Sequence, residues 1–195
     1  MEITMEEQTL SEYCRKGNEA ARKELYEKYA NRLFGICLRY VCNTDAAKDI
    51  FQNGFLKIYQ SFDKFIWRSQ GSLRAWLDRI MINEALQYLR LKRDISVVKS
   101  DIPIEEIESH YYIPDPETIE RIPGKILMQF ITELPEGYRT VFNLFAIEGK
   151  SHREIADILH INEKSSSSQY HRAKSILAKR INEWTNEEDT DKYAE

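Results

Sequence analysis

The feature that most constrains the fold of this chain is a run of three short helical segments over residues 134–181. Ser151 is a favourable helix N-cap, and Glu154 three positions later completes a capping box in front of an apolar stripe. A tight connection at 160–162 ends this helix, and Asn162 can cap the next one. Two helices joined by about four residues define a helix-turn-helix, whose second helix normally enters the DNA major groove. The run therefore predicts a unit that reads duplex DNA.

The last helix of this run has two distinct sides. Its predicted buried side consists of Tyr170, Ala173, Ile176, Leu177 and Ile181. Its outward side carries groups that can bond base edges or phosphates, namely Ser167, Ser168, Gln169, His171, Arg172 and Lys174. The plainer interpretation of the same pattern is a three-helix bundle with a polar surface.

Residues 8–93 are also expected to be helical throughout. Apolar residues recur at helical spacing over 25–41 and again over 50–62, and the break at 42–45 offers a new helix cap. The opposite side of the second of these helices is a compact polar surface with one apolar member, formed by Asp49, Gln52, Asn53 and Leu56. Without further context, this surface reads as a solvated helix face.

A third helix is expected to follow the loop at 67–72. Trp76 lies on its apolar face and is expected in the core, whereas Trp67 lies in the loop. The other side of this helix is one ridge of hydrogen-bonding groups, formed by Arg79, Asn83, Gln87 and Arg90 and leading into Lys92 and Arg93.

Charge is distributed unevenly along the chain, whose formal net charge is −4. Residues 94–123 carry eight acidic and two basic side chains, include several prolines and show no sustained helical period, which is typical of a linker. The flanking blocks are each net basic, so the overall sign does not argue against DNA binding. We therefore expect an all-α protein with helical domains over 8–93 and 124–182, a flexible acidic linker over 94–123 and a solvated, disordered acidic tail over 183–195.

Composition argues against several classes of protein. No apolar run approaches the roughly 18 residues that cross a bilayer, and the first residues are acidic rather than a basic signal region, so we expect a cytoplasmic protein without membrane insertion. Cys14, Cys37 and Cys42 are odd in number and form no C-x-x-C pair, which indicates buried thiols rather than disulfides or a zinc site. No metal or other cofactor is expected.

Four runs of residues resemble the sigma-70 superfamily of bacterial RNA polymerase sigma factors. The resemblance to region two lies in DAAKDIFQNGF at 45–55, GSLRAWL at 71–77 and INEALQYLR at 82–90. LPEGYRTVF at 134–142, together with the helix-turn-helix, resembles region four. A chain with only these two regions and a short acidic linker is similar to the extracytoplasmic-function group of alternative sigma factors. The resemblance runs from about Leu10 to Ile181.

The resemblance implies a protein that binds core RNA polymerase and directs promoter-specific transcription initiation, without chemistry of its own. In the family, the helix that holds Asp49, Gln52, Asn53 and Leu56 docks on a coiled coil of the largest polymerase subunit, which gives Leu56 a reason to be exposed. The polymerase flap region is a second implied contact. An anti-sigma factor is a further partner that many relatives have, although no residue here marks its binding site.

The resemblance also assigns promoter contacts. The family captures a base flipped out of the minus-ten element, which here implies a site formed by Trp67, Gln70, Ser72, Arg79, Asn83, Gln87, Arg90, Lys92 and Arg93. Extruding a base costs a few kcal/mol of stacking, and Asn83 above all would offset that cost by bonding the base edge. The acidic linker would run toward the active site of the polymerase and its RNA exit path.

In region four, the outward face of the last helix would read the minus-thirty-five element through Ser167, Ser168, Gln169, His171, Arg172 and Lys174. Ser166 replaces an aliphatic residue common in the family, and Gln169 replaces a basic one, so we expect weaker packing and either a changed minus-thirty-five preference or a weaker dependence on that element. Because serines are poor helix formers, we expect this segment to order fully only on DNA. Asn53 likewise stands where the family commonly has glutamate.

Two other classes of function remain open. A conventional helix-turn-helix repressor or activator would bind duplex DNA unaided and would leave the Asp49 surface and the Asn83 ridge without a role. A carboxylate-dependent hydrolase using Glu105 and Glu106 is disfavoured, because both residues lie in the expected linker without a convergent constellation.

Overall fold

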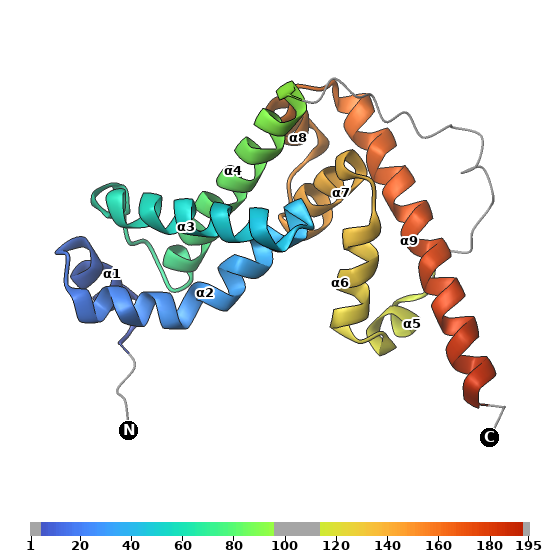
Figure 1. The fold of residues 1–195 in the computed structure, drawn as a ribbon, viewed down its shortest axis with the longest axis horizontal. Coiled ribbons are helices and arrows are strands. Elements are labelled where there is room, and N and C mark those ends of the chain that lie inside the picture. The colour runs from blue at the N-terminus through green and yellow to red at the C-terminus, as the bar shows by residue number, and fades with distance from the viewer. Residues whose placement is uncertain (1–4, 96–113, 193–195) are drawn as a thin grey trace. The chain divides into compact units, whose positions relative to one another are not determined.

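The chain divides into two compact helical units, residues 1–98 and residues 99–195. The computed structural model describes residues 5–95 and 114–192, apart from the side chains at 93–95, 116 and 187–192. All regular structure in these ranges is helical, which confirms the all-α class (Figure 1).

The first unit is built from four α-helices and a short 3-10 turn. They are α1 (Glu7–Arg15), α2 (Glu19–Val41), α3 (Thr44–Gln60), η1 (Phe62–Lys64) and α4 (Ser72–Ile95). The predicted break at 42–45 is present, since Cys42 ends α2 in the left-handed region at φ 52°. The side chain of Asn43 then caps α3 by accepting a hydrogen bond from the Ala46 amide at 2.8 Å.

The core of this unit lies where α2, α3 and α4 pack on one another. Leu33, Ile58 and Leu77 are fully buried there. Gly54 lets α3 approach α4 closely, since a Cβ at this position would lie 2.3 Å from the Met81 sulfur. Trp76 is half-buried, with its ring centroid 5.1 Å from those of both Phe62 and Phe65, as its place on the apolar stripe predicted.

The three cysteines differ in exposure and therefore in expected reactivity. Cys14 and Cys37 are fully buried, and burial raises their pKa values to about 11 and about 12. Cys42 is exposed, contrary to the expectation of three buried thiols, because it occupies the end of α2.

Since the thiolate is the reactive form, a disulfide reagent at pH 8 is expected to label Cys42 within minutes and the other two thiols only after unfolding. Peptide mapping of the labelled chain tests this, and rapid labelling of Cys37 in the folded protein would contradict it.

The second unit contains the predicted helix-turn-helix and further helices. Its elements are α5 (Pro116–Arg121), α6 (Gly124–Glu133), α7 (Glu136–Phe142), the π-helical turn η3 (Asn143–Ile147), α8 (His152–Leu159) and α9 (Glu163–Lys192). Residues 114–122, expected within the linker, contribute a helix and a core residue, because Ile122 is buried with Phe130 and Ile181. The rest of the expected linker, 96–113, lies outside the described residues.

The expectation of a disordered tail over 183–195 is wrong for residues 183–192. α9 continues as a helix to Lys192, and Trp184 packs against the cluster formed by Ile122, Phe130 and Ile181. Arg180 on the same helix forms an ion pair with Glu133 of α6 at 2.5 Å, and this hydrogen-bonded contact lowers the pKa of Glu133. Packing of one apolar edge therefore outweighs the acidic composition of this segment. No helix among the described residues is long and apolar enough to cross a bilayer.

Candidate nucleic-acid and protein interfaces

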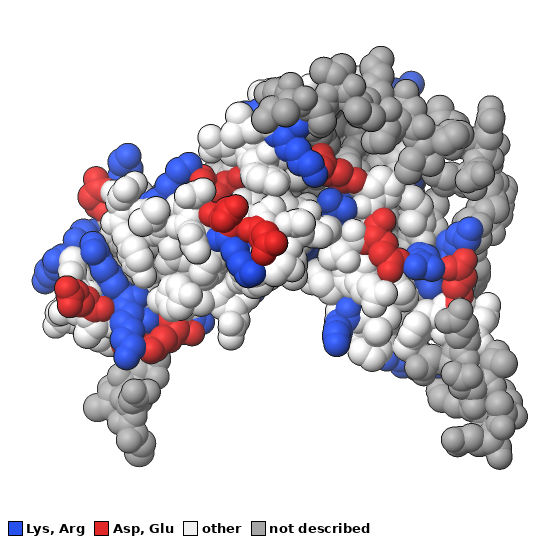
Figure 2. All heavy atoms as spheres, in the orientation of Figure 1, with Lys and Arg blue, Asp and Glu red and all other residues white. Residues whose placement is uncertain are grey.

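The surface predicted to dock on a protein partner is a ridge along α3, here called the α3 ridge. Its members Asp49, Gln52, Asn53 and Leu56 are all exposed, and the Leu56 side chain is 58% accessible. Grooves of about 610 Å³ and 420 Å³ flank it, and Leu56 lines both of them. In Figure 2, the surface over α2 and α3 is largely uncharged, with basic and acidic side chains scattered around it. A single-sign patch of the kind that binds phosphate is not seen on this face.

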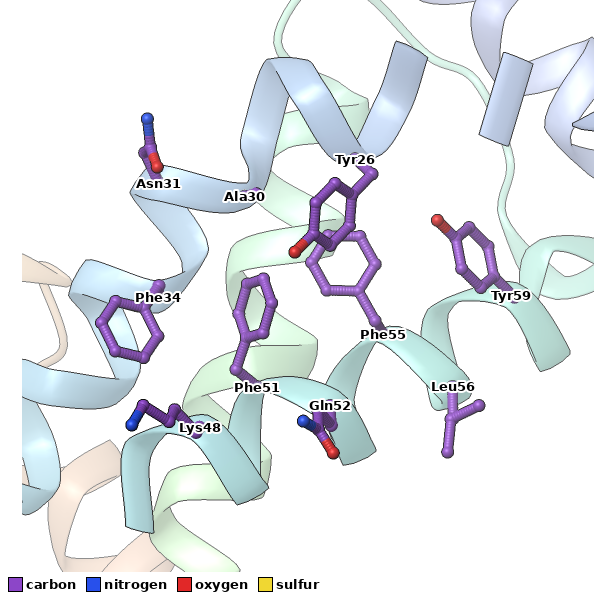
Figure 3. Close-up of a pocket in the computed structure, with 10 residues that line it drawn as sticks. All are labelled: Tyr26, Ala30, Asn31, Phe34, Lys48, Phe51, Gln52, Phe55, Leu56 and Tyr59. Atoms are coloured by element: carbon purple, nitrogen blue, oxygen red, sulfur yellow. The ribbon is translucent and has the colours of Figure 1, made fainter. Parts of the chain in front are cut away.

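The larger groove lies between α2 and α3 and has an aromatic lining (Figure 3). Its rings belong to Tyr26, Phe34, Phe51, Phe55 and Tyr59, and neighbouring ring centroids are 4.8–5.9 Å apart. Gln52 and Leu56 of the α3 ridge line the same groove. Sequence periodicity indicated apolar faces on these helices but not this opening, which depends on how far apart the two helices lie.

The smaller groove joins the α3 ridge to α4. Asp49, Asn53 and Leu56 line it from α3, and Gln87 and Leu91 line it from α4. Lys57 crosses between the helices in a 2.5 Å ion pair with Glu84. Gln87, expected among the promoter contacts, therefore lies beside the predicted protein-docking surface.

The predicted minus-ten residues divide between α4 and the preceding loop. Five of the α4 residues are exposed, namely Arg79, Asn83, Gln87, Arg90 and Lys92, whereas the side chain of Arg93 lies outside the described residues. In the loop, Gln70 is exposed and Trp67 is half-buried. The Ser72 hydroxyl accepts a hydrogen bond from the Arg68 amide at 3.4 Å and so helps to close the loop.

Helix α1 contacts this loop through two side chains that the sequence analysis did not single out. Glu7 is only 4% exposed, and its carboxylate accepts hydrogen bonds from the backbone amides of Gly71 and Arg74. Arg15, at the other end of α1, donates to the backbone carbonyls of Phe62 and Phe65. No local signal marks these contacts, because the partners are 47 to 67 residues away in sequence.

The helix-turn-helix is formed by α8 and α9 as predicted. Ser151 and Glu154 form the capping box, with the Glu154 amide donating to the Ser151 hydroxyl at 3.2 Å and the Ser151 amide donating to the Glu154 carboxylate at 2.8 Å. These hydrogen bonds lower the pKa of the Glu154 carboxyl. His160 adopts φ 55° in the turn, and Asn162 caps α9 by accepting from the Ser165 amide at 2.6 Å.

The outward face of α9 is less uniformly available than the sequence predicted. Ser168 and His171 are exposed, whereas Ser167 and Gln169 are half-buried. The other two predicted residues, Arg172 and Lys174, contact tyrosines of their own unit. Arg172 donates to the Tyr138 hydroxyl at 3.1 Å, and the Lys174 ammonium lies 5.1 Å from the centre of the Tyr170 ring. Either cation must exchange or share this contact to reach DNA.

Ser166 does not simply weaken the packing of α9. It is fully buried, and its hydroxyl lies 3.0 Å from Nδ1 of His152 in α8. The His152 ring stacks on Phe145 with centroids 4.3 Å apart. A polar pair thus takes the place of the aliphatic contact, and α9 is helical from Glu163 onward through all four serines without DNA. The expectation of a segment ordered only on DNA is not what the structure shows.

Replacing Ser166 tests this pair. Ser166→Ala is expected to lower the free energy of unfolding by about 1 kcal/mol, because His152 loses its buried partner. Urea unfolding measures the change. Ser168→Ala is the matched control, since it gains the same helix propensity at an exposed position and is expected to be neutral or slightly stabilising. Equal stability of the two variants would contradict a stabilising role for the pair.

Within residues 5–95 and 114–192, no group of three or more His, Cys, Asp or Glu side chains could hold a metal ion.

Comparison with known proteins matches both units to one family. The family model "Sigma-70 region 2" covers residues 25–94, and "Sigma-70, region 4" covers residues 124–177. The ECF RNA polymerase sigma-E factor of Haemophilus influenzae is 28% identical over 90% of this chain and 95% of its own. The RNA polymerase sigma-H factor of Pseudomonas aeruginosa is 29% identical over 90% of this chain and 94% of its own.

A third relative, the ECF RNA polymerase sigma factor SigW of Bacillus subtilis, is 26% identical over 86% of this chain and 92% of its own. Among solved structures, the sigma factor RpoE in complex with the anti-sigma factor NepR from Bartonella quintana aligns with a TM-score of 0.49 and 20% identity over 82% of this chain and 96% of that chain. The family assignment follows from the two region models and from relatives that match over nearly their whole length. The chain belongs to the extracytoplasmic-function group of sigma-70 RNA polymerase sigma factors.

Proposed function

We propose that this alternative sigma factor binds core RNA polymerase through the α3 ridge and contacts promoter DNA through α4, the loop before it and α9. The observation that carries the proposal is the exposure of Leu56 between two grooves on a helix whose neighbour presents the Asn83 ridge. One small unit thereby offers a protein-docking face and a row of hydrogen-bonding groups beside it. Its family consists of non-catalytic initiation factors, and the polar groups on these faces suit binding rather than chemistry.

The α3 ridge has the composition of a protein-binding surface. An apolar side chain surrounded by polar groups is the usual pattern of an interface hot spot, in which the centre is desolvated and the rim stays hydrated. A coiled coil of the largest polymerase subunit is the partner that fits, since side chains of a helical rod can enter the grooves on either side of Leu56. Asn53 in place of an acidic residue removes one charge from this contact.

The loop before α4 and the Asn83 ridge on α4 would bind the minus-ten element. A flipped base needs a pocket that bonds its edge and a surface on which it stacks. Asn83 can supply the first and Trp67 the second, while Arg79, Arg90 and Lys92 are placed to hold the strand through phosphates. Binding of the extruded base would favour the melted promoter.

The second unit would hold the minus-thirty-five element and contact the polymerase flap region. Ser168 and His171 are the exposed residues best placed to meet base edges from α9. Because Arg172 and Lys174 also contact tyrosines, we expect a modest contribution from this element and greater reliance on the minus-ten contacts. We place the protein in the cytoplasm with the polymerase, and an anti-sigma factor is the regulator that this family assignment favours.

Run-off transcription with bacterial core polymerase tests the proposal. A candidate promoter is obtained by selecting, from a library of genomic fragments, templates whose transcription requires the wild-type protein. Asp49→Ala, Gln52→Ala is the test variant. Lys23→Ala, Glu27→Ala is the control, since it removes an exposed ion pair on α2 that lines neither groove. We expect transcription with wild type and control, and a loss of at least about tenfold with the test variant.

Equal activity of both variants would overturn the assignment of the α3 ridge, and duplex binding without any association with core would favour a conventional regulator.

A further inference from the structure

The segment that connects α3 to α4 is held at both of its ends by α1. At the first end, Arg15 Nε donates to the Phe62 carbonyl at 3.2 Å, and its Nη2 donates to the Phe65 carbonyl. At the second end, Glu7 Oε2 accepts from the Gly71 amide at 2.5 Å, and its Oε1 accepts from the Arg74 amide at 3.1 Å. One short helix thus fixes the two boundaries of the loop that carries Trp67 and Gln70.

Glu7 acts as a helix cap supplied from another helix. The first amides of a helix have no partner within it, and a carboxylate near them gains from both hydrogen bonds and the helix dipole. Gly71 precedes α4 with φ +86°, a backbone conformation that residues with a side chain rarely adopt. The approach of its amide to Glu7 therefore depends on glycine. The Tyr29 hydroxyl donates to the same carboxylate at 3.1 Å, and burial together with Glu7 raises the pKa of Tyr29.

We propose that α1 is a brace that presets the loop for capture of the flipped base, with Glu7 and Arg15 as positioning residues. This inference rests on the proposed minus-ten function of the loop and of Asn83. Because Glu7 bonds the first turn of α4, it fixes the loop to the same rigid helix that carries the Asn83 ridge. A pocket whose walls come from a loop and a helix binds tightly only if the two are held in register before the ligand arrives.

Removing the brace is expected to affect binding differently from removing a contact that only stabilises the fold. Loss of overall stability would weaken every interaction of the folded protein in proportion to the folded fraction. Loss of the brace would weaken only those contacts that need the loop and α4 in register. The affinity gained from a single flipped base is therefore the quantity to measure.

The experiment measures binding of the complete holoenzyme to a fluorescent single-stranded probe. The probe is the non-template strand of the minus-ten element from a promoter that the wild-type protein transcribes, and a series of probes carries an abasic site at each position in turn. The position at which base removal weakens wild-type binding most defines the captured base. Glu7→Gln keeps the size of the side chain but removes its charge, and Glu12→Gln on the exposed side of α1 is the control.

We expect Glu7→Gln to weaken binding of the intact probe about tenfold and binding of the abasic probe less than twofold, with Glu12→Gln unchanged on both. Arg15→Gln, at an exposed position, is expected to show the same pattern and serves as the second variant if Glu7→Gln folds poorly. Equal losses on the two probes, or no loss on either, would overturn the brace.

Asn83→Ala separates failure of the inference from failure of the proposed function. If Asn83→Ala weakens the intact probe selectively and the α1 variants do not, the minus-ten assignment stands and the brace is wrong. If Asn83→Ala has no selective effect, the minus-ten assignment fails and the brace fails with it.

Discussion

Leu56→Asp is expected to weaken binding to core RNA polymerase about 100-fold without unfolding the protein. Leu56 is 58% exposed, so its replacement removes little buried contact, and the change in unfolding free energy is expected to stay within about 0.5 kcal/mol. At the centre of an interface, by contrast, the loss of an apolar anchor and the burial of a carboxylate together cost about 3 kcal/mol, which corresponds to about 100-fold in affinity. Fluorescence anisotropy of labelled protein titrated with core polymerase measures the affinity.

The matched control for Leu56 is Ile66→Asp. Ile66 is the most exposed large apolar side chain in the described part of the first unit, at 71%, but it lies in the loop before α4 and not on the α3 ridge. Its replacement is expected to leave the affinity for core within twofold. If the two variants bind core equally well, the docking surface lies elsewhere. If Leu56→Asp binds core normally and fails only on DNA, the α3 ridge belongs to the promoter-binding surface.

The helices of this protein could be predicted from sequence because their signals are local. The break at 42–45, the cap at Asn43 and the capping box of Ser151 with Glu154 each involve residues within four positions of one another. The same period that identifies the buried stripe of a helix also identifies its exposed side. For that reason Asp49 and Asn83 were placed on surfaces correctly, while their roles came from the resemblance to sigma factors.

Features that depend on contacts between distant residues could not be predicted in this way. Glu7 resembles any other acidic residue near a chain start until α1 folds against the first turn of α4. Ser166 reads as a defect in an apolar stripe until His152 is found beside it. The acidic stretch after residue 182 reads as solvated, although Trp184 on one edge of the helix packs on the core. In each case one contact with a residue distant in sequence changes the interpretation of the residue.

Arg139 is a buried charge whose role follows from the end of α6. It is 7% exposed, and its Nη1 donates to the Leu134 carbonyl at 2.6 Å and to the Thr132 carbonyl at 3.3 Å. Carbonyls at the end of a helix lack partners within the helix, and Pro135 follows directly. The guanidinium can satisfy several of them at once and also complements the negative end of the helix dipole. It thereby fixes the corner between α6 and α7.

Arg139→Met is expected to lower the free energy of unfolding of the second unit by about 3 kcal/mol, because the Leu134 and Thr132 carbonyls lose a charged donor. Hydrogen exchange followed by mass spectrometry locates the effect, with faster exchange expected in peptides from 124–186 and unchanged exchange in those from 19–92. Arg139→Lys is expected to recover about half of the loss, since the ammonium keeps the positive charge and can donate to a carbonyl but is more strongly hydrated than a guanidinium and therefore costs more to bury.

Arg153→Met provides the control, because Arg153 is exposed on α8 and its replacement is expected to change stability by less than about 0.5 kcal/mol. A loss below 1 kcal/mol for Arg139→Met would show that the end of α6 is satisfied without the guanidinium. A loss spread equally over both units would show that they unfold together. Only a loss confined to the second unit, and partly rescued by lysine, supports Arg139 as the residue that holds the corner on which the helix-turn-helix is built.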